Sequence, residues 1–552
     1  MVKPMKRIIS LLLALILMVG VLSSCVAEEE TAAESSSDVP TADSEAAESI
    51  NTSQPKPVDT DGMFTERDSK TEYDKSNCVS ITLNGDSISC SSKAVTINGN
   101  VASITDEGTY IIAGTLNDGM IVVNADDTDK LQIVLDGASI TSSTSAPIYV
   151  AKAKKVFITL ADNSNNVLAN GGSFVAIDDS NIDAVVFSTE NITFNGNGSL
   201  SIDSPTGHGI SSKDDLVIAG GTYQINSTLR ALDANDSVRI KDSTLALNSQ
   251  KDAIHAENAE DVEKGFVYIR SGTVKIDSKG DGISASSYVQ IDDGTFEIVT
   301  SNKDKTVSIR SIKASTNVYL GGGDFTLQSG DDVIKAKDSV TIAGGTFVMK
   351  ADDDAINANA VFISDGEVSI PECYEGIDSK KIEISDGIIS IVAAKDAIKA
   401  HADSQEEQSE KAEMTVRGGF LNIQSDDDGI DIDGTLTVLD GTIVLFASKL
   451  SGSQTLSCTE TVVAKGGTIA CFDWNSLTVT FSDDSIAMVK LSLDAERPAE
   501  MNVSCSNNSN IKIFEQKAER SFRKLRIYSG KVSKGEVCTV ALGDSLMTTA
   551  AK

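Results

Sequence analysis

The stretch Gly330–Phe347, GDDVIKAKDSVTIAGGTF, has near-copies on both sides of it, and this repetition decides the fold. The next copy, Ala351–Val368, reads ADDDAINANAVFISDGEV and places Ile356 22 residues after Ile334. Aligned on this anchor position, successive copies lie 22, 22, 29, 29, 22, 22, 21, 21 and 32 residues apart. A base period of 21 to 22 residues with occasional insertions is typical of a solenoid. The anchors are Ile210, Leu232, Ile254, Ile283, Ile312, Ile334, Ile356, Ile377, Ile398 and Ile430.

Each period contains three short segments in which inward and outward positions alternate, as they do in β-strands. In one copy these segments are Ile334–Ala336, Val340–Ile342 and Phe347–Met349. A glycine precedes the third segment in nearly every copy, which indicates a turn with a positive φ angle. We therefore predict an all-β parallel β-helix, right-handed because parallel crossovers almost always are. A β-propeller, whose blades need about 40 residues, or a β-sandwich fits this period less well.

The chain divides into four predicted regions. Three basic residues precede a long apolar run, and Leu22–Cys25 (LSSC) resembles a bacterial lipobox. We predict a lipoprotein signal peptide over 1–24, with lipid on Cys25 and the protein on the extracellular side of the cell membrane. An ordinary signal peptide with an incidental cysteine is the alternative. A disordered, acidic tether rich in Ser, Ala and Glu is predicted over 25–63, then the β-helix over 64–446 and an all-β capping region over 447–552.

The charge of the chain limits its partners. Aspartate and glutamate number 81 against 47 lysines and arginines, which gives a net charge of -34. Such a charge argues against nucleic acid and against anionic membrane surfaces, apart from contact through a lipid anchor, and it favours cation binding. We expect a monomer.

Acidic residues recur two positions before the anchor. In a β-helix these residues lie one above another, about 4.8 Å apart. Repulsion between two such charges is about 3.5 kcal/mol at an effective dielectric constant of 20. Calcium prefers clustered carboxylates, so we predict structural calcium here, while turn capping without metal or direct ligand binding remain alternatives. The candidate ligands are Asp331, Asp332, Asp352, Asp353, Asp354, Glu375, Asp396, Asp426, Asp427 and Asp428.

Two rows of outward residues are candidates for carbohydrate binding. Tyr268, Tyr319 and Phe362 occupy the middle position of the second segment in alternate coils. Their spacing of about 9.6 Å is close to the two-sugar repeat of an extended β-linked polysaccharide, so we expect these rings to face solvent and stack on sugars. Packing against neighbouring coils is the alternative. The position after the anchor supplies three further candidates, Lys335, Asn357 and Lys399.

Common catalytic motifs are absent from the sequence. It contains no G-x-S-x-G, no H-E-x-x-H and no P-loop. A calcium-dependent polysaccharide lyase needs less, namely carboxylates on calcium and a basic residue as proton acceptor. Arg310, Lys313, Lys335 and Lys399 stand near acids and could serve, although compensation of the acidic charge is the simpler interpretation.

The pattern S-x-D-D-A-I-x-A followed by V-x-I-x-G-G-x-F resembles the carbohydrate-binding domain family of clostridial surface lipoproteins. Gly108–Gly114 (GTYIIAG), Ile140–Ala146 (ITSSTSA) and Tyr528–Glu536 (YSGKVSKGE) carry the same resemblance, which covers roughly 64–545. It implies a calcium-containing parallel β-helix of pectate-lyase-like architecture that binds cellulose or pectin-like polysaccharide. The family supplies no residue-level catalytic motif, and several copies here keep one acid where the pattern has two.

Residues and resemblance together predict a cell-surface lipoprotein that binds plant-type polysaccharide, cellulose or pectin-like, without cleaving it. A calcium-dependent lyase of the pectate type is the first alternative. A surface adhesin or scaffold that recognises protein is the second.

Overall fold

The computed structural model describes residues 54–175, 177–304, 306–402, 411–450, 452–482 and 486–552. The predicted signal peptide, Cys25 and residues 25–53 of the predicted tether lie outside this part. Within it, the helices are the short 3-10 turns η1 (Glu66–Ser69) and η2 (Lys75–Asn77). None of the described helices is long and apolar enough to cross a bilayer.

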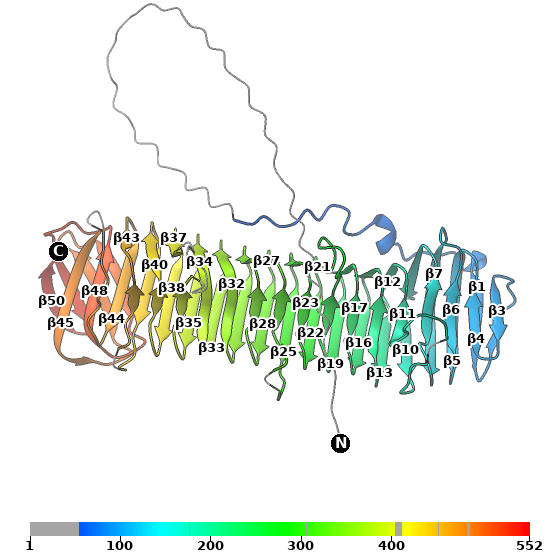
Figure 1. Cartoon of the computed structure of the whole chain (residues 1–552). Helices are drawn as coiled ribbons and strands as arrows, with labels where there is room; N and C mark the ends of the chain where they lie inside the picture. Colours follow the sequence, from blue (N-terminus) through cyan, green and yellow to red (C-terminus); the bar gives the residue numbers. More distant parts are fainter. Residues whose placement is uncertain (1–53, 176, 305, 403–410, 451, 483–485) are drawn as a thin grey trace, which may run out of the picture. The chain divides into compact units, whose positions relative to one another are not determined.

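The described chain from about Val79 to Asp473 forms a parallel β-helix, as the repeat predicted (Figure 1). Each coil contributes strands to three faces, and each strand pairs in parallel with its equivalent in the next coil. Ile312, Ile334 and Ile356 are paired vertically, so residues 22 apart in sequence are neighbours in space. The anchor side chains fill the interior.

The anchor face carries the strands that begin near each anchor residue. It comprises β4 (Val101–Ile104), β6 (Met120–Asn124), β8 (Ile148–Lys152), β11 (Ala184–Ser188), β14 (His208–Ser212), β17 (Leu232–Ala234), β20 (Ile254–Ala256), β23 (Ile283–Ala285), β26 (Ile312–Ala314), β29 (Ile334–Ala336), the first parts of β32 (Asp354–Ile363) and β34 (Glu375–Ile384), β36 (Ile398–Ala400), β39 (Ile430–Ile432) and β42 (Leu456–Cys458). At its start, β3 (Val95–Asn98) pairs with β4 in antiparallel fashion.

The middle face carries the second strand of each coil. It comprises the first parts of β5 (Gly108–Leu116) and β7 (Lys130–Ser142), β9 (Lys155–Leu160), β12 (Ile192–Gly196), β15 (Asp215–Ala219), β18 (Ser237–Lys241), β21 (Phe266–Ile269), β24 (Val289–Ile291), β27 (Asn317–Leu320), β30 (Ser339–Ile342), the second parts of β32 and β34, β37 (Ala412–Val416), β40 (Gly434–Val438) and β43 (Val462–Ala464). The first coil is completed by β1 (Val79–Gly85), which pairs with β5, and by β2 (Ile88–Ser89).

The third face follows the glycine turn. It comprises the second parts of β5 and β7, β10 (Asn165–Asn170), β13 (Ser199–Ser204), β16 (Thr222–Ser227), β19 (Thr244–Ser249), β22 (Thr273–Ser278), β25 (Thr295–Thr300), β28 (Asp324–Ser329), β31 (Thr346–Ala351), β33 (Glu367–Cys373), β35 (Ile388–Ala393), β38 (Phe420–Ser425), β41 (Thr442–Phe446) and β44 (Thr468–Asp473).

The glycine turn has the positive φ angle that the sequence predicted. Gly345 adopts a φ of 100°, and a Cβ added there would lie 2.7 Å from the carbonyl oxygen of Gly323 in the coil before it. Conformation and close stacking of the turns therefore both require glycine. Where Ser243 interrupts the column, Asp242 takes the positive φ instead, at 51°.

Identical side chains stack inside the third face. The rings of Phe296, Phe325 and Phe347 form a ladder with centroid separations of 4.7 and 4.5 Å and an interplanar angle of 5° at each step. These separations equal the spacing of hydrogen-bonded strands. The ladder shows that side chains as well as backbone keep the register of the coils.

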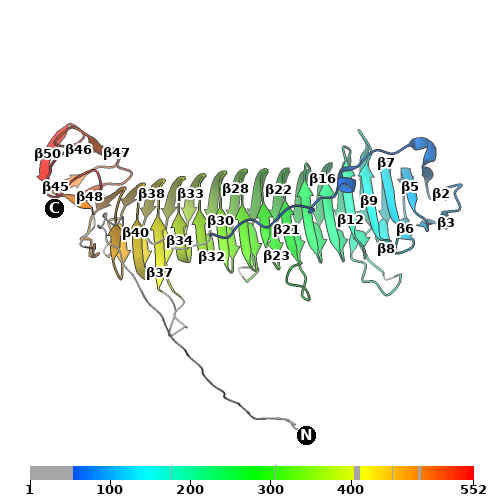
Figure 2. The ribbon, with the colours of Figure 1, turned by 90° about the horizontal axis from the view of Figure 1, so that it is seen from above.

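The predicted tether over 25–63 is wrong for its described end, because residues 54–63 pack against the middle face. We call residues 54–68 the strap; Figure 2 shows it in blue, crossing the stack over the middle face. Val58 N donates to Gln290 Oε1 (2.8 Å), and Gln54 Nε2 donates to Ser364 Oγ (2.7 Å). Four residues of extended chain span about 14 Å, and so do the three coil steps between these two partners. The strap is thus extended along the stacking direction.

The predicted start of the capping region at 447 is also wrong by one coil. β42, β43 and β44 continue the parallel stacking as far as Asp473. The insertion after Phe446 lengthens this coil, which hides the period in the sequence. Beyond it, β48 (Phe522–Ser529) pairs antiparallel with β44, and β45 (Ala487–Arg497) pairs antiparallel with the other edge of β48. A sheet of β47 (Lys512–Lys517), β46 (Asn502–Asn507), β49 (Val537–Leu542) and β50 (Ser545–Ala550) completes this all-β end.

Candidate functional site

A column of acids lies at the turn that leads into the anchor face. Asp332 stands just before β29, while Asp354 and Glu375 begin β32 and β34 and are paired with each other across adjacent coils. All three side chains are buried. A backbone N–H partly compensates the charge of Asp332, because Asp354 N donates to Asp332 Oδ1 (3.4 Å). The acids therefore meet as vertical neighbours, as the sequence predicted.

Cationic side chains from neighbouring positions compensate the column in part. Lys335 Nζ lies 2.8 Å from Asp332 Oδ2, and Arg310 Nη2 lies 3.0 Å from Asp331 Oδ2. Glu375 accepts from two lysines, with 2.6 Å to Lys395 Nζ and 3.2 Å to Lys399 Nζ. These ion pairs compensate part of the negative charge of the column, but carboxylates still outnumber cations around Asp353 and Asp354.

Two groups of acids bring their oxygens close enough to share a cation. In each group one oxygen per residue lies within 4.8 Å of the others. The first group is Asp331, Asp332 and Asp353, and the second is Asp354, Glu375 and Asp378. The first group borders a polar pocket of about 270 Å³ that Asp331, Asp352 and Asp353 help to line. Carboxylate oxygens beside a solvent-accessible pocket suit calcium, which completes its coordination with water.

Burial of these acids makes their negative charge unfavourable. Burial, together with the charges of Asp332, Asp378 and Asp353, raises the pKa of Asp354 to about 7 despite a hydrogen bond from Asn357. The pKa of Asp353 is raised as well, first by burial and then by the charges of its acidic neighbours. Protons compete for these oxygens in the absence of a cation, and a bound divalent cation would displace them.

The other predicted ligands do not join either group among the described residues. Asp396 accepts from the backbone N–H of Asp428 (2.9 Å), and Asp428 accepts from that of Gln454 (2.8 Å). Asp426 pairs with Arg520 at 2.8 Å, and the side chain of Asp427 is exposed. Asp396 and Asp428 therefore cap turns, which was the alternative to calcium binding that the sequence left open.

The expectation that the middle-face aromatics look into solvent is wrong for two of them. Tyr268 is 2% exposed and Phe362 6% exposed. The strap residue Phe64 covers Tyr268, with ring centroids 5.7 Å apart, and the Tyr268 hydroxyl donates to Asp292 Oδ2 (2.6 Å). The side chains do point away from the β-helix interior, but the strap lies over this face.

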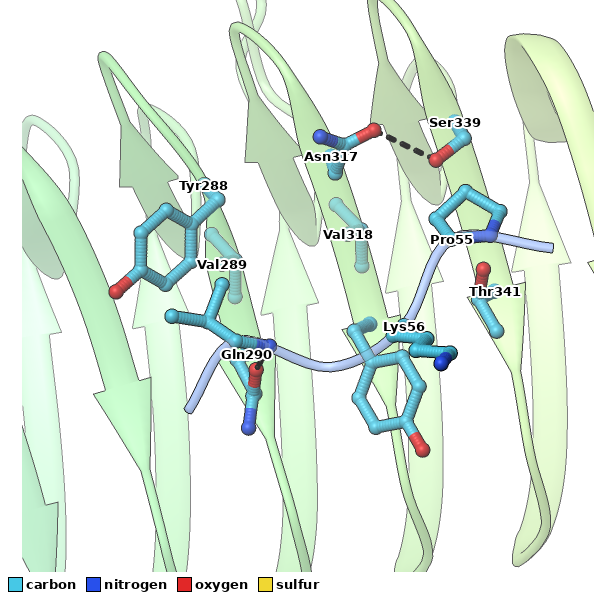
Figure 3. Close-up of a pocket in the computed structure, with 11 residues that line it drawn as sticks. Pro55, Lys56, Tyr288, Val289, Gln290, Asn317, Val318, Ser339 and Thr341 are labelled. Carbon is cyan, nitrogen blue, oxygen red and sulfur yellow. Dashed lines mark hydrogen bonds between the residues drawn. The ribbon is translucent and has the colours of Figure 1, made fainter. Parts of the chain in front are cut away.

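Tyr319 lies partly exposed at the edge of the strap. It lines an apolar pocket of about 80 Å³ with Pro55, Lys56 and Val58 of the strap and with Gln290 (Figure 3). A pocket of this size holds one or two water molecules and no sugar. Tyr319 therefore stays a predicted stacking residue that the strap partly covers.

Lys335, Asn357 and Lys399 share the outer surface of the anchor face with the acids. Register places Lys335 beside Asn357, and Asp378 between Asn357 and Lys399. Asn357 Nδ2 donates to Asp354 Oδ2 at 2.8 Å. We call this row and the two acid groups the polar ridge. All of its outward residues are partly exposed, so a polymer lying along the coils can reach them.

Sequence reasoning missed Asp378 of the polar ridge, Lys395 that pairs with the ridge, and the strap. Asp378 follows the anchor Ile377, in the outward column beside the acids, and that position was its available signal. Lys395 precedes Asp396 directly and reaches back to Glu375 in the coil before it. No periodic signal marks the strap, because its partners on the β-helix lie between 65 and 310 residues away in sequence.

A model of the family described as carbohydrate-binding domain-containing protein matches residues 98–355 and 353–493, which include the whole polar ridge. The chain belongs to this family. A carbohydrate-binding domain-containing protein of Acetivibrio thermocellus is 36% identical over 203 residues, which are 36% of this chain and 71% of the relative.

A solved structure of the polysaccharide lyase-like protein from C. thermocellum, a gadolinium derivative, shares 31% sequence identity with this member of the carbohydrate-binding domain-containing family. The likeness covers 44% of this chain and 96% of that chain, with a TM-score of 0.41. The family match confirms the predicted family, and the parallel pairing of strands from coil to coil confirms the predicted β-helix.

Proposed function

We propose that the polar ridge binds an acidic, pectin-like polysaccharide without cleaving it and that calcium links the two. Membership of a carbohydrate-binding family supports the class of ligand. The observation that carries the proposal is the group of Asp331, Asp332 and Asp353, of which Asp331 and Asp353 border a polar pocket. A calcium ion held there leaves coordination positions for the carboxylates of a polyuronide, while neighbouring lysines offer further charge.

The acid groups fit calcium by the chemistry of their donors. They supply oxygens only, and calcium is a hard cation that prefers such ligands. Asp331, Asp332 and Asp353 would hold the ion, and it would supply positive charge to a surface that otherwise repels a polyanion. Asp354, Glu375 and Asp378 fit less well, because none of them lines the polar pocket that Asp331 and Asp353 border.

The pKa values of Lys395 and Lys399 argue against either lysine as the proton acceptor of a lyase. A lysine that accepts a proton near neutral pH needs a lowered pKa. Burial would lower the pKa of Lys399, but its hydrogen bonds to Glu375 and the charge of that residue outweigh burial and raise it. The pKa of Lys395 is raised too, chiefly by its hydrogen bond to Glu375. These residues suit binding a carboxylate better than removing a proton.

Retention on beads that carry covalently attached polygalacturonate tests the proposal, with cellulose and bare beads beside them. We expect retention in calcium that falls in chelator, and a loss of about tenfold or more in Asp353→Asn. Asp203→Asn, at an exposed acid of β13, is the matched control. Equal retention on bare beads would favour an adhesin. Release of unsaturated uronides from the polymer would replace binding by lyase activity.

We also propose that Cys25 carries lipid and holds the protein at the outer surface of the cell membrane. The support is the sequence of basic residues, apolar run and Leu22–Cys25. We expect Cys25→Ala to move the protein from the membrane fraction to the soluble fraction of cells. Unchanged fractionation would contradict the anchor.

A further inference from the structure

A second candidate site lies where the β-helix meets its C-terminal sheets. Trp474 follows β44, Lys449 lies in the insertion after β41, and Arg520 and Ser521 precede β48. Together with Ala447 and Ser448 these residues line a pocket of about 330 Å³, within the range of small-ligand sites. This pocket lies on different coils from the polar ridge.

The indole of Trp474 is held in a fixed position. Its Nε1 donates to the backbone carbonyl of Ser521 at 2.6 Å. The preceding residue, Asp473, is buried and paired with Arg526, and it accepts from Thr455 Oγ1 at 2.7 Å. A fixed aromatic surface binds the C–H face of a sugar with little loss of conformational entropy.

Cationic side chains surround this ring in a protein of net charge -34. Lys449 Nζ lies 4.6 Å from the ring centroid, and the guanidinium carbon of Arg523 lies 5.4 Å from it. Arg520 lines the pocket together with Lys449. Three cations against the two acids that pair with them, Glu496 and Asp426, leave a local excess of one positive charge, which favours an anionic ligand.

Two of these cations already bind carboxylates of the protein. Lys449 Nζ lies 2.6 Å from Glu496, and Arg520 Nη1 lies 2.8 Å from Asp426. Both acids are well exposed, so a ligand carboxylate can replace them at little cost. Arg523 is exposed and forms no ion pair within 4.0 Å among the described residues. It is the cation most readily available to a ligand.

We propose that the Trp474 pocket binds one uronate residue of an acidic polysaccharide, as a subsite independent of calcium. A uronate unites the two features that the pocket recognises, a sugar ring for the indole and a carboxylate for Arg523 and Lys449. The inference rests on the proposed function for its class of ligand. It places a second contact for the polymer at the C-terminal end of the coils.

Fluorescence tests this subsite directly, because Trp474 is the sole tryptophan of the chain. The full chain is titrated with digalacturonate in excess chelator, which silences a calcium-dependent ridge. We expect a saturable change of the tryptophan emission and an affinity for cellobiose at least about tenfold weaker. Sodium acetate at matched concentration should produce no such change.

Substitutions assign the response to the pocket. We expect Arg523→Gln and Lys449→Gln each to weaken digalacturonate binding about tenfold. Arg270→Gln, at an exposed arginine after β21, is the matched control and should bind as the unaltered chain does. No saturable change, equal responses to digalacturonate and cellobiose, or an equal response to acetate would each overturn the subsite. If the fluorescence response persists while calcium-dependent retention on the beads fails, the Trp474 pocket is supported and only the proposed role of the polar ridge is contradicted.

Discussion

The anchor face and the middle face present outward side chains from the same coils, yet they end in different surroundings. On the anchor face Asp331, Asp353 and Asp378 of the polar ridge remain at least partly exposed, and Asp331 and Asp353 border a polar pocket. On the middle face the strap covers Tyr268 and borders Tyr319. Stacking alone makes both columns continuous, so the difference comes from a segment outside the repeat. Ligand access on a β-helix therefore depends on what covers a face as much as on what lines it.

Asp68 fixes the covered face, and its removal should have the largest effect. It is 1% exposed and accepts from Lys155 Nζ (2.7 Å) and Thr193 Oγ1 (2.8 Å). Asp68→Ala leaves Lys155 without this partner, so we expect the strap to lose about 3–5 kcal/mol of docking free energy. Hydrogen exchange of residues 54–64 measures the loss, with exposed Asp59→Ala as control. Unchanged protection would show that the strap is held elsewhere.

The two faces should respond to pH with opposite sign. Hydrogen bonding and the charge of Lys155 outweigh burial and lower the pKa of Asp68, so its contribution to stability is lost as pH falls. The pKa of Asp354 is raised from 3.8 to about 7, so its contribution is present at low pH and lost as pH rises toward 7.

Without calcium, ionisation of Asp354 should therefore lower the free energy of unfolding by on the order of 3–4 kcal/mol as the pH rises from 4 to 8. Denaturant unfolding across this range measures the change. Asp354→Asn should flatten it, and Asp203→Asn should leave it as it is. If the unfolding free energy of Asp354→Asn changes with pH as it does in the unaltered chain, another group is responsible for the titration.

Tyr319 should show the smallest effect. Because Pro55, Lys56 and Val58 of the strap line the same pocket, we expect Tyr319→Ala to change retention on polygalacturonate by less than about twofold. The bead assay measures this beside Asp353→Asn. A loss as large as that of Asp353→Asn would move the polysaccharide site to the middle face.

The repeat predicted most of the fold because stacking converts sequence period into spatial contact. The vertical pairing of Ile334 with Ile356, the turn at Gly345 and the meeting of Asp354 with Glu375 all follow from that period. Features outside the period escaped prediction. The strap and the last coil, with its insertion after Phe446, leave no regular spacing to read.

The sequence could not show which acids are paired with cations, just as it could not show which face the strap covers. Composition shows that acids exceed bases, but not that Lys395 and Lys399 both reach Glu375. The period places acids in a column, but backbone capping by Asp396 and Asp428 depends on the exact turn geometry. We favour Asp331, Asp332 and Asp353 as the cation site because Asp331 and Asp353 border the polar pocket.

Calorimetric titration with calcium tests the central claim most directly, namely that these three acids hold a cation. We predict saturable binding at calcium concentrations of about 1 mM or below, which covers the affinities of known calcium-binding modules. Asp353→Asn should weaken it about tenfold or more, and Asp203→Asn should leave it unchanged. Absence of binding at these concentrations, or equal binding by Asp353→Asn, would contradict the claim.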